Sequence, residues 1–160
     1  MEEQDMAFVL LGTGNAEYED FMRSAEWRHK GRLCAYIGYD EALSHRVYAG
    51  SDFLLMPSSF EPCGLSQMIA MRYGTLPIVR ETGGLKDTVH AYEAWNGAGN
   101  GFSFANYNAG DMCHVVCEAI DLYHNNKPAC AALQKRGMTA DFSWTRSAKA
   151  YNDIYRSICR

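Results

Sequence analysis

The sequence lacks a long hydrophobic run, a basic stripe and any cysteine spacing typical of a zinc site or a disulfide framework. Because a helix needs about 20 consecutive apolar residues to cross a bilayer, the first absence argues against a membrane span. No signal peptide is recognisable either. With 15 basic and 19 acidic residues, the formal net charge of −4 argues against a nucleic-acid partner. We therefore expect an ordinary soluble protein that binds neither membranes nor nucleic acids.

The cysteines predict free thiols rather than ligands. None forms a C-x-x-C pair, and only Cys113 and Cys117 have a spacing that could hold a metal from one predicted helix. No second pair of ligands follows them, so we expect buried free thiols, no metal and no cofactor. The other cysteines are Cys34, Cys63, Cys130 and Cys159. Unpaired thiols are typical of a reducing compartment, and a cytoplasmic location is predicted.

Short apolar runs alternate with stretches of helical periodicity along the chain. The apolar runs predict strands at residues 8–11, 33–37, 53–56, 76–79 and 101–104. A helical stretch follows each of the first four strands, and the chain is predicted to be mainly helical from residue 111. This alternation predicts an α/β fold, a Rossmann-like parallel sheet with helices on both faces. The length suits a single domain over residues 1–160 with a core of its own.

Residues 52–67 carry the clearest functional signal. The apolar run at 53–56 predicts a strand buried on both faces, and a helix opens after the loop that follows. That loop lies at the carboxyl end of a parallel strand, where open α/β sheets bind their ligands. The free amides of residues 64–66 suit an anion, and the carboxylate of Glu61 suits hydroxyl groups. A ligand with both needs is a sugar phosphate or a nucleotide sugar.

Other loops follow predicted strands and are expected at the same edge of the sheet. They are residues 12–15, 38–40 and 82–85. Gly12 and Gly14 begin a dinucleotide fingerprint, but Glu17 stands where the third glycine is needed. A nicotinamide cofactor is therefore not expected.

Two of these loops and one strand end leave alternatives open. Gly83 and Gly84 let backbone amides approach a phosphate closely, or they form a tight turn that Thr82 caps. Tyr39 stacks on a base or packs against the protein. Arg80 reaches a phosphate or ends its strand in solvent.

Several stretches closely resemble bacterial glycogen synthases and plant starch synthases. They are Ile37–Tyr39 with Ser44–Arg46, Ser59–Leu65, and Tyr73–Pro77 with Thr82–Leu85 and Asp87–Val89. The resemblance runs from about residue 6 to about residue 158, and its centre, Phe-Glu-Pro-Cys-Gly-Leu, is highly specific. It implies a retaining glucosyltransferase of the GT-B architecture, which transfers glucose from ADP-glucose to an α-1,4-glucan without a metal. The residues themselves suit ADP-glucose or UDP-glucose.

The resemblance implies roles for the residues of the central loop. Glu61 is the expected catalytic residue, whose carboxylate holds hydroxyl groups of the donor glucose. The backbone at Cys63 and Gly64 is expected to help it. Leu65 and Ser66 are expected to receive the diphosphate through their amides and the serine hydroxyl.

The resemblance also implies roles outside that loop. Tyr39 matches the residue that packs on adenine, and Thr82, Gly83 and Gly84 are expected to line the same cleft. Many related glycosyltransferases carry a second glutamate, eight positions after the first, that holds the ribose. Ile69 stands at that position, so contact with the ribose must come from elsewhere.

Parts of the family pattern are absent from the sequence. The carboxyl-terminal GT-B domain begins with a strand and a loop whose arginine and lysine grip the diphosphate, whereas this chain starts at the expected second strand. The amino-terminal domain, with the acceptor groove and a catalytic histidine, is absent as well. We therefore interpret the chain as a donor-binding half, inactive alone, that binds ADP-glucose or ADP and reaches a glucan through the other domain. The alternative is a stand-alone nucleotide- or sugar-binding module without catalysis.

The absent first strand predicts open edges in the sheet. In a doubly wound sheet that strand lies between the strands predicted at 8–11 and 53–56, so both lose a neighbour. Unpaired backbone groups on apolar strands attract other chains. The chain is expected to close the gap by pairing directly across it, by swapping a segment with a second copy or by aggregating, and self-association through the exposed edge is the favoured outcome.

Overall fold

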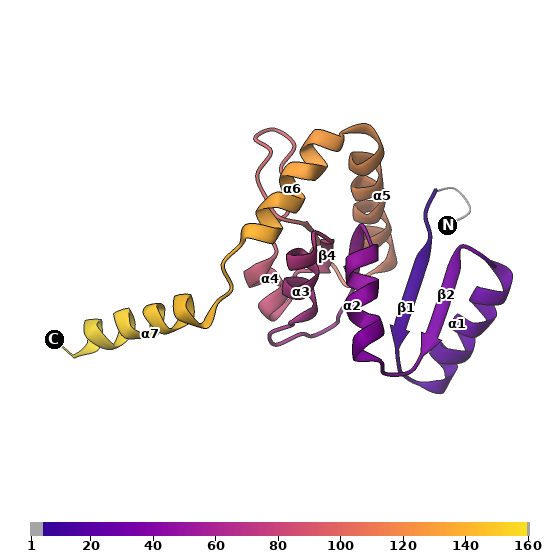
Figure 1. The fold of residues 1–160 in the computed structure, drawn as a ribbon, viewed down its shortest axis with the longest axis horizontal. Coiled ribbons are helices and arrows are strands. Elements are labelled where there is room, and N and C mark those ends of the chain that lie inside the picture. The colour runs from indigo at the N-terminus through magenta and orange to yellow at the C-terminus, as the bar shows by residue number, and fades with distance from the viewer. Residues whose placement is uncertain (1–4, 160) are drawn as a thin grey trace. The chain divides into compact units, whose positions relative to one another are not determined.

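The computed structural model describes residues 5–159 and divides into two compact units, one ending at Gly50 and the other beginning at Ser51 (Figure 1). The expectation that residues 1–160 act as a single domain stays a prediction.

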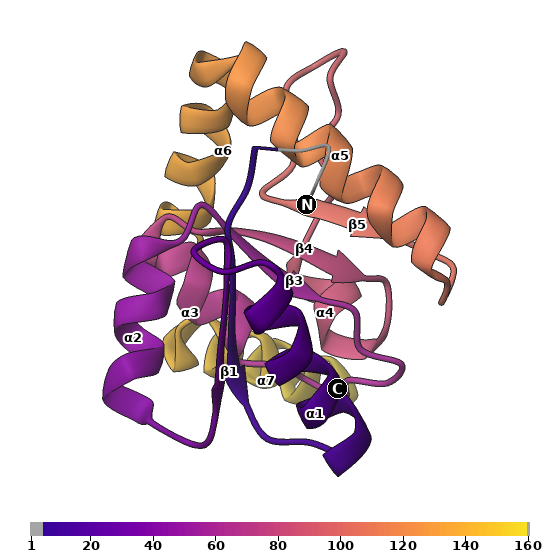
Figure 2. The same ribbon diagram turned by 90° about the vertical axis from the view of Figure 1, so that its right-hand side faces the viewer.

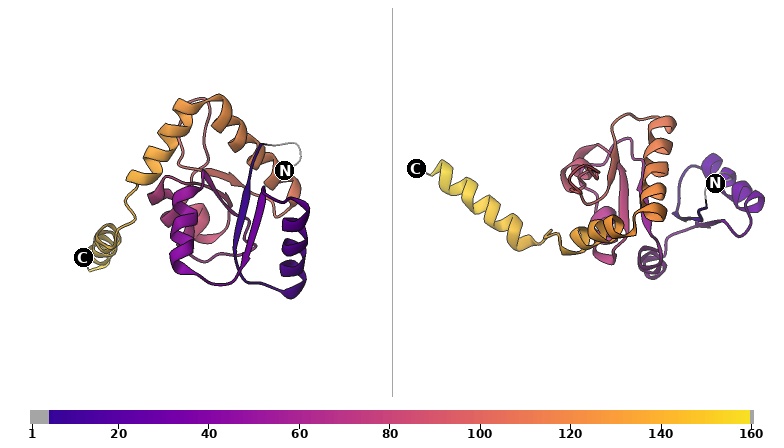
Figure 3. Two further views of the ribbon diagram at one scale, coloured as in Figure 1. Left: turned by 45° about the vertical axis from the view of Figure 1, so that its right-hand side comes forward. Right: turned by 90° about the horizontal axis from the view of Figure 1, so that it is seen from above.

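The first unit is a two-stranded parallel sheet with two helices. Its elements are β1 (Phe8–Gly12), α1 (Ala16–Arg28), β2 (Leu33–Ile37) and α2 (Glu41–Gly50). β1 and β2 pair residue for residue over their full length, and α1 forms the crossover that a parallel pair requires (Figure 3). Asp40 caps α2, since its Oδ1 accepts a hydrogen bond from the amide of Leu43 at 2.8 Å.

The second unit contains a three-stranded parallel sheet in the order β3-β4-β5 (Figure 2). Its elements are β3 (Phe53–Met56), α3 (Ser66–Tyr73), β4 (Leu76–Arg80), α4 (Gly83–Thr88), β5 (Phe102–Phe104), α5 (Ala109–Asn125), α6 (Lys127–Thr139) and α7 (Trp144–Ile158). Ser143 caps α7, because its Oγ accepts a hydrogen bond from the amide of Arg146. None of the residues of α7 that the structure describes is buried.

The core of the second unit lies on both faces of β4. Leu76 and Ile78 pack in one cluster with residues of β5, α5 and α6, including Leu133. Val79 packs in a second cluster with Leu85 of α4 and Met71 of α3. Because successive side chains of a strand point to opposite faces, α5 and α6 cover one face of this sheet and α3 and α4 cover the other (Figure 2).

The α/β fold predicted from the sequence is confirmed: parallel sheets are flanked by helices, and the predicted strands and helices occur within a few residues of their expected bounds. In residues 5–159 the strands form two sheets, β1-β2 in the first unit and β3-β4-β5 in the second. Within its own unit, each of β1 and β3 therefore lies at an edge of its sheet. No described helix is long and apolar enough to span a membrane.

The expectation of buried thiols is wrong for most of the cysteines. The described residues contain no disulfide, and Cys130 is the one cysteine among them that is buried. Cys113 and Cys117 lie one helical turn apart on the solvent side of α5, away from Val115 and Ala119, which pack in the core. The 3.6-residue period of the helix places both cysteines on that exposed side.

Candidate functional site

The loop between β3 and α3 is held by the strand next to it. The guanidinium of Arg80, at the end of β4, donates hydrogen bonds to the carbonyl oxygens of Ser58 at 3.2 Å and Ser59 at 2.7 Å. It also lies over the ring of Tyr107, with 5.3 Å from the guanidinium carbon to the ring centroid. Arg80 thus does not end its strand free in solvent. Its guanidinium fixes the loop instead.

Glu61 lies in the middle of that loop with its carboxylate unused. The side chain is half-buried, and in residues 5–159 its oxygens accept no hydrogen bond and form no ion pair. The backbone oxygen of Glu61, in contrast, accepts a hydrogen bond from the amide of Gly84 at 3.3 Å, shared with the oxygen of Pro62. A carboxylate on an anchored backbone is positioned to accept hydrogen bonds from a ligand.

The two glycines at the start of α4 allow this close backbone contact. A Cβ atom at Gly83 would overlap the carbonyl oxygen of Glu61, and one at Gly84 would overlap that of Cys63. Gly83 also has a φ of +43°, which other residues rarely adopt. Thr82, the predicted cap, makes no side-chain capping hydrogen bond. The glycine pair therefore brings two loops together rather than forming a capped turn.

The amino end of α3 presents free backbone donors beside this contact. Among the described residues, the amides of Gly64, Leu65 and Ser66 donate to no acceptor. Leu65 is largely exposed, and the other two are half-buried. Amides at a helix start carry a partial positive charge and attract anions. A free carboxylate and free amides thus lie within one short loop.

The first unit has its own cluster of loops. The amide of Gly38 donates to the oxygen of Gly12 at 3.0 Å, so the turns after β1 and β2 share one edge of their sheet. Tyr39 follows with a side chain that is 87% exposed, so it does not pack in the core of its unit. Its ring is available for stacking. Its approach to the loops of the second unit stays a prediction.

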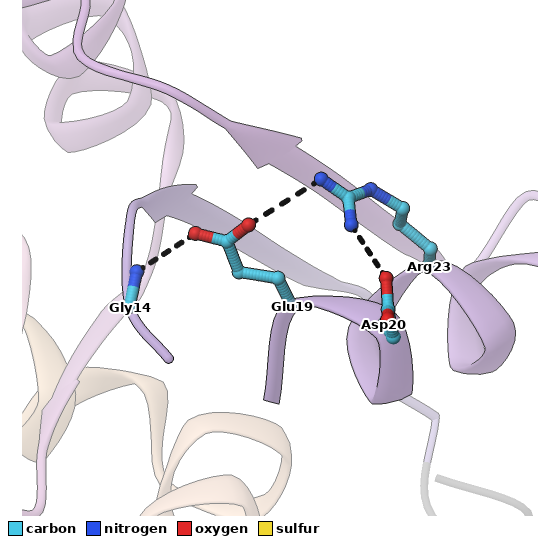
Figure 4. Close-up of polar contacts among 4 residues, drawn as sticks. All are labelled: Gly14, Glu19, Asp20 and Arg23. Atoms are coloured by element: carbon cyan, nitrogen blue, oxygen red, sulfur yellow. Dashed lines mark hydrogen bonds and ion pairs between the residues drawn. The ribbon is translucent and has the colours of Figure 1, made fainter. Parts of the chain in front are cut away.

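A carboxylate of the protein occupies the turn at residues 12–15 (Figure 4). Oε1 of Glu19 accepts a hydrogen bond from the amide of Gly14 at 2.9 Å. Arg23 bridges Glu19 at 3.4 Å and Asp20 at 2.8 Å (Figure 4). Because this amide is already satisfied by a negative charge, the turn does not offer it to a phosphate. The geometry agrees with the missing third glycine in arguing against a dinucleotide site.

The structure therefore brings together the predicted site residues of the second unit, namely Glu61, Cys63, Gly64, Leu65, Ser66, Thr82, Gly83 and Gly84. Sequence reasoning did not identify the side chains that support these residues. Arg80 donates to carbonyl oxygens of the loop, and Gln67 is hydrogen-bonded to Thr88. The described residues contain no group of three or more His, Cys, Asp or Glu side chains that could hold a metal ion.

Comparison with known proteins gives consistent matches. The family profile described as "Glycosyl transferases group 1" matches residues 1–138. The chain is 53% identical over 156 residues to a glycogen synthase of Bacillus cereus (strain B4264) and 52% identical over 155 residues to one of Lachnospira eligens. Among solved structures it resembles the catalytic domain of starch synthase IV from Arabidopsis thaliana, bound to ADP and acarbose, with a TM-score of 0.83 and 38% identity. The resemblance predicted from the sequence is confirmed.

These matches cover nearly all of the chain but a minor part of each relative. They span 98%, 97% and 96% of the chain, against 33%, 32% and 33% of the three relatives in the same order. The chain thus spans about a third of the length of the curated relatives that it matches.

The contact between the two loops makes a first prediction. Replacing Gly84 by Ala should lower the free energy of unfolding of the second unit by about 1–3 kcal/mol, because the added methyl group overlaps the oxygen of Cys63. Denaturant unfolding followed through amide signals of the second unit measures the change. Gly14→Ala is the control, since nothing lies within 4 Å of a Cβ there. Equal stability of the two variants would contradict the proposed overlap.

Proposed function

Because the chain belongs to the glycosyl transferases group 1 family, we propose that it is the donor-binding part of a retaining glycogen or starch synthase, which transfers glucose from ADP-glucose to an α-1,4-glucan. The observation that carries this proposal is the contact of the Glu61 loop with the Gly83–Gly84 turn. It leaves a free carboxylate next to free amides, as a nucleotide sugar requires. A cytoplasmic location forms part of the same proposal.

Glu61 binds the donor sugar in this proposal. An ionised carboxylate only accepts hydrogen bonds, so hydroxyl groups of glucose are suitable partners. Since the carboxylate has no partner in the described residues, binding does not have to break an ion pair first. The backbone at Cys63 and Gly64 completes the sugar-binding side. Contact with the reacting sugar makes Glu61 the candidate catalytic residue.

The amino end of α3 binds the diphosphate. The amides of Leu65 and Ser66 and the serine hydroxyl donate to phosphate oxygens, and the helix dipole favours the negative charge. During transfer the sugar–phosphate bond breaks and negative charge grows on the leaving diphosphate. Fixed donors aimed at that charge lower the barrier of this step.

Tyr39 and residues 82–84 complete the donor site. The exposed ring of Tyr39 stacks on the adenine, since stacking of a base on an aromatic side chain is favourable. Thr82, Gly83 and Gly84 line the same cleft. The starch synthase structure bound to ADP supports an adenine nucleotide as the ligand class.

A stand-alone nucleotide- or sugar-binding module without catalysis is the alternative. Such a module has the same nucleotide-sugar site as the proposed synthase, but it neither binds nor extends a glucan. The share of the relatives that the chain covers, about a third, is the observation that keeps this alternative open.

A nucleotide titration tests the donor site. With ADP we expect weak binding and amide shifts at residues 38–40, 64–66 and 82–85. Glu61→Gln should weaken the binding of ADP-glucose about tenfold and leave that of ADP unchanged, because its partner is the sugar. Glu118→Gln, at an exposed position of α5, is the matched control. Shifts confined to residues 12–15, or equal losses for both nucleotides, would count against the assigned roles.

The isolated 160-residue chain is expected not to elongate glycogen. Transfer requires the glucan to be held against the donor sugar, and the acceptor groove is proposed to lie in the remainder of the parent protein. Incorporation of labelled glucose from ADP-glucose into glycogen measures the activity, with Glu61→Gln as the background. Incorporation above that background would refute the requirement for a further domain.

We also propose that the chain associates with itself through an open strand edge. Within the described residues β1 pairs only with β2, and β3 pairs only with β4. Val9 on β1 is 48% exposed, and all four apolar residues of β3 are half-buried. Apolar strands with an unpaired edge form ladders with other chains.

Sedimentation at low micromolar concentration tests this association. We expect a species larger than the monomer, and Val9→Lys should shift it toward the monomer, because a charge at an edge strand opposes pairing. Glu118→Gln, on α5, produces the same change in net charge and is the control. A wild-type monomer whose β1 and β3 amides are fully protected from exchange would contradict the proposal.

A further inference from the structure

Gln67 is a fully buried polar side chain directly behind the candidate donor site. It lies in the first turn of α3 with 0% relative exposure. The two protons of its Nε2 are shared among three acceptors, namely the oxygen of Gly64 at 2.9 Å, the oxygen of Cys63 at 3.2 Å and Oγ1 of Thr88 at 3.0 Å. Gln67 thus connects the loop at residues 57–65, called the donor loop below, to Thr88 of α4, which lies 21 residues away in sequence.

The hydroxyl of Thr88 fixes the direction of these bonds. Its single proton is donated to the oxygen of Gly84 at 2.6 Å, so toward Gln67 the hydroxyl oxygen acts as an acceptor. The other two partners of Gln67 are carbonyl oxygens, which only accept. The amide group therefore has one permitted orientation, and the hydrogen bonds run from Gln67 through Thr88 to Gly84.

These bonds close a circuit around the donor loop. The amide of Gly84 donates back to the oxygens of Glu61 and Pro62, at 3.3 Å each. Gln67 holds the other end of the same loop at Cys63 and Gly64. The spacing between the Glu61 loop and the start of α4 is thus set by side chains that a bound ligand would not touch.

This arrangement of hydrogen bonds lowers the stability of the fold, because it leaves one buried polar atom of Gln67 without a partner in residues 5–159. Oε1 of Gln67 is buried and has no hydrogen-bond partner in the described residues, and a buried polar atom without a partner is unfavourable. An apolar side chain of similar size would avoid this cost and still fill the space. A Cβ at Gly64 would approach that oxygen at 2.6 Å, so the neighbouring glycine is adapted to it as well.

We propose that Gln67 and Thr88 are positioning residues, which hold the sugar-binding carboxylate and the phosphate-binding amides at the separation that one nucleotide sugar requires. The inference rests on the proposed function and identifies residues that make the site selective for the intact donor. ADP has no sugar for the Glu61 carboxylate to bind, so its affinity does not need a fixed separation between that carboxylate and the amides. ADP-glucose engages both sides, so its affinity depends on the circuit.

Three variants of the 160-residue chain and one matched control test the proposal. Thr88→Val and Gln67→Met remove the hydrogen bond between residues 67 and 88 and keep side chains of similar size. Thr88→Ser keeps the hydroxyl group. Thr75→Val is the control, because Thr75 is 1% exposed and its hydroxyl donates to the oxygen of Ser51 at 2.9 Å, outside the donor loops.

The first readout is hydrogen exchange at the amide of Gly84. Gln67→Met should raise its rate by about three- to tenfold, which corresponds to the loss of one ordinary hydrogen bond, although Gln67 does not contact that amide. Thr88→Val should do the same, and Thr88→Ser and Thr75→Val should leave the rate near that of the wild type. An unchanged rate in Gln67→Met, at equal global stability, overturns the circuit whether or not the chain binds nucleotides.

The second readout is the ratio of the dissociation constants for ADP and ADP-glucose. General destabilisation weakens both ligands equally, whereas loss of positioning weakens ADP-glucose about three- to tenfold more than ADP. Thr88→Ser should restore the wild-type ratio. Wild-type binding of both nucleotides with an unchanged ratio in Thr88→Val and Gln67→Met overturns the positioning role. A wild-type chain that binds neither nucleotide instead overturns the proposed function, and the exchange rates then decide the circuit alone.

Discussion

Burial of β4 on both faces is the constraint on which the site depends. Its side chains alternate between two hydrophobic clusters, so this strand has a fixed register and a fixed depth in the second unit. Two contacts of the site follow from that position. Arg80 lies where the strand ends and holds the loop that carries Glu61, and Gly83 and Gly84 lie in the turn that follows. A displacement of β4 would move both sides of the site together.

The site combines backbone groups with very few functional side chains. The proposed phosphate contacts are amides at the start of α3, and the loop itself is held through its carbonyl oxygens by Arg80, Gln67 and Gly84. Each buried donor that holds a carbonyl also reduces the freedom of a loop that would otherwise be mobile. Preorganisation of this kind lowers the entropic cost of binding a flexible nucleotide sugar.

Sequence patterns predicted the elements and the central loop because these depend on local signals. The apolar run of β3, the glycines and the carboxylate of Glu61 are visible within a few residues of one another. The supporting residues were not predictable in this way. Gln67 and Thr88 each read as ordinary helix residues, and their bond joins positions 21 residues apart. The exposure of Cys113 and Cys117 was missed because residue type was weighted above helical phase. The pairing of strands into two sheets also depends on contacts between distant segments, which periodicity does not report.

The close approach of the Gly83–Gly84 turn to the donor loop limits how this site can change over evolutionary time. Every other amino acid carries a Cβ atom, so any substitution at either glycine pushes against a carbonyl oxygen of the loop. The anion-binding amides, in contrast, belong to the main chain and are unaffected by most mutations. Exposed side chains such as Tyr39 and Leu65 are free to vary without disturbing that backbone contact. In the proposed donor site, mutation can therefore change the preferred nucleotide or sugar far more readily than it can abolish an affinity for a diphosphate.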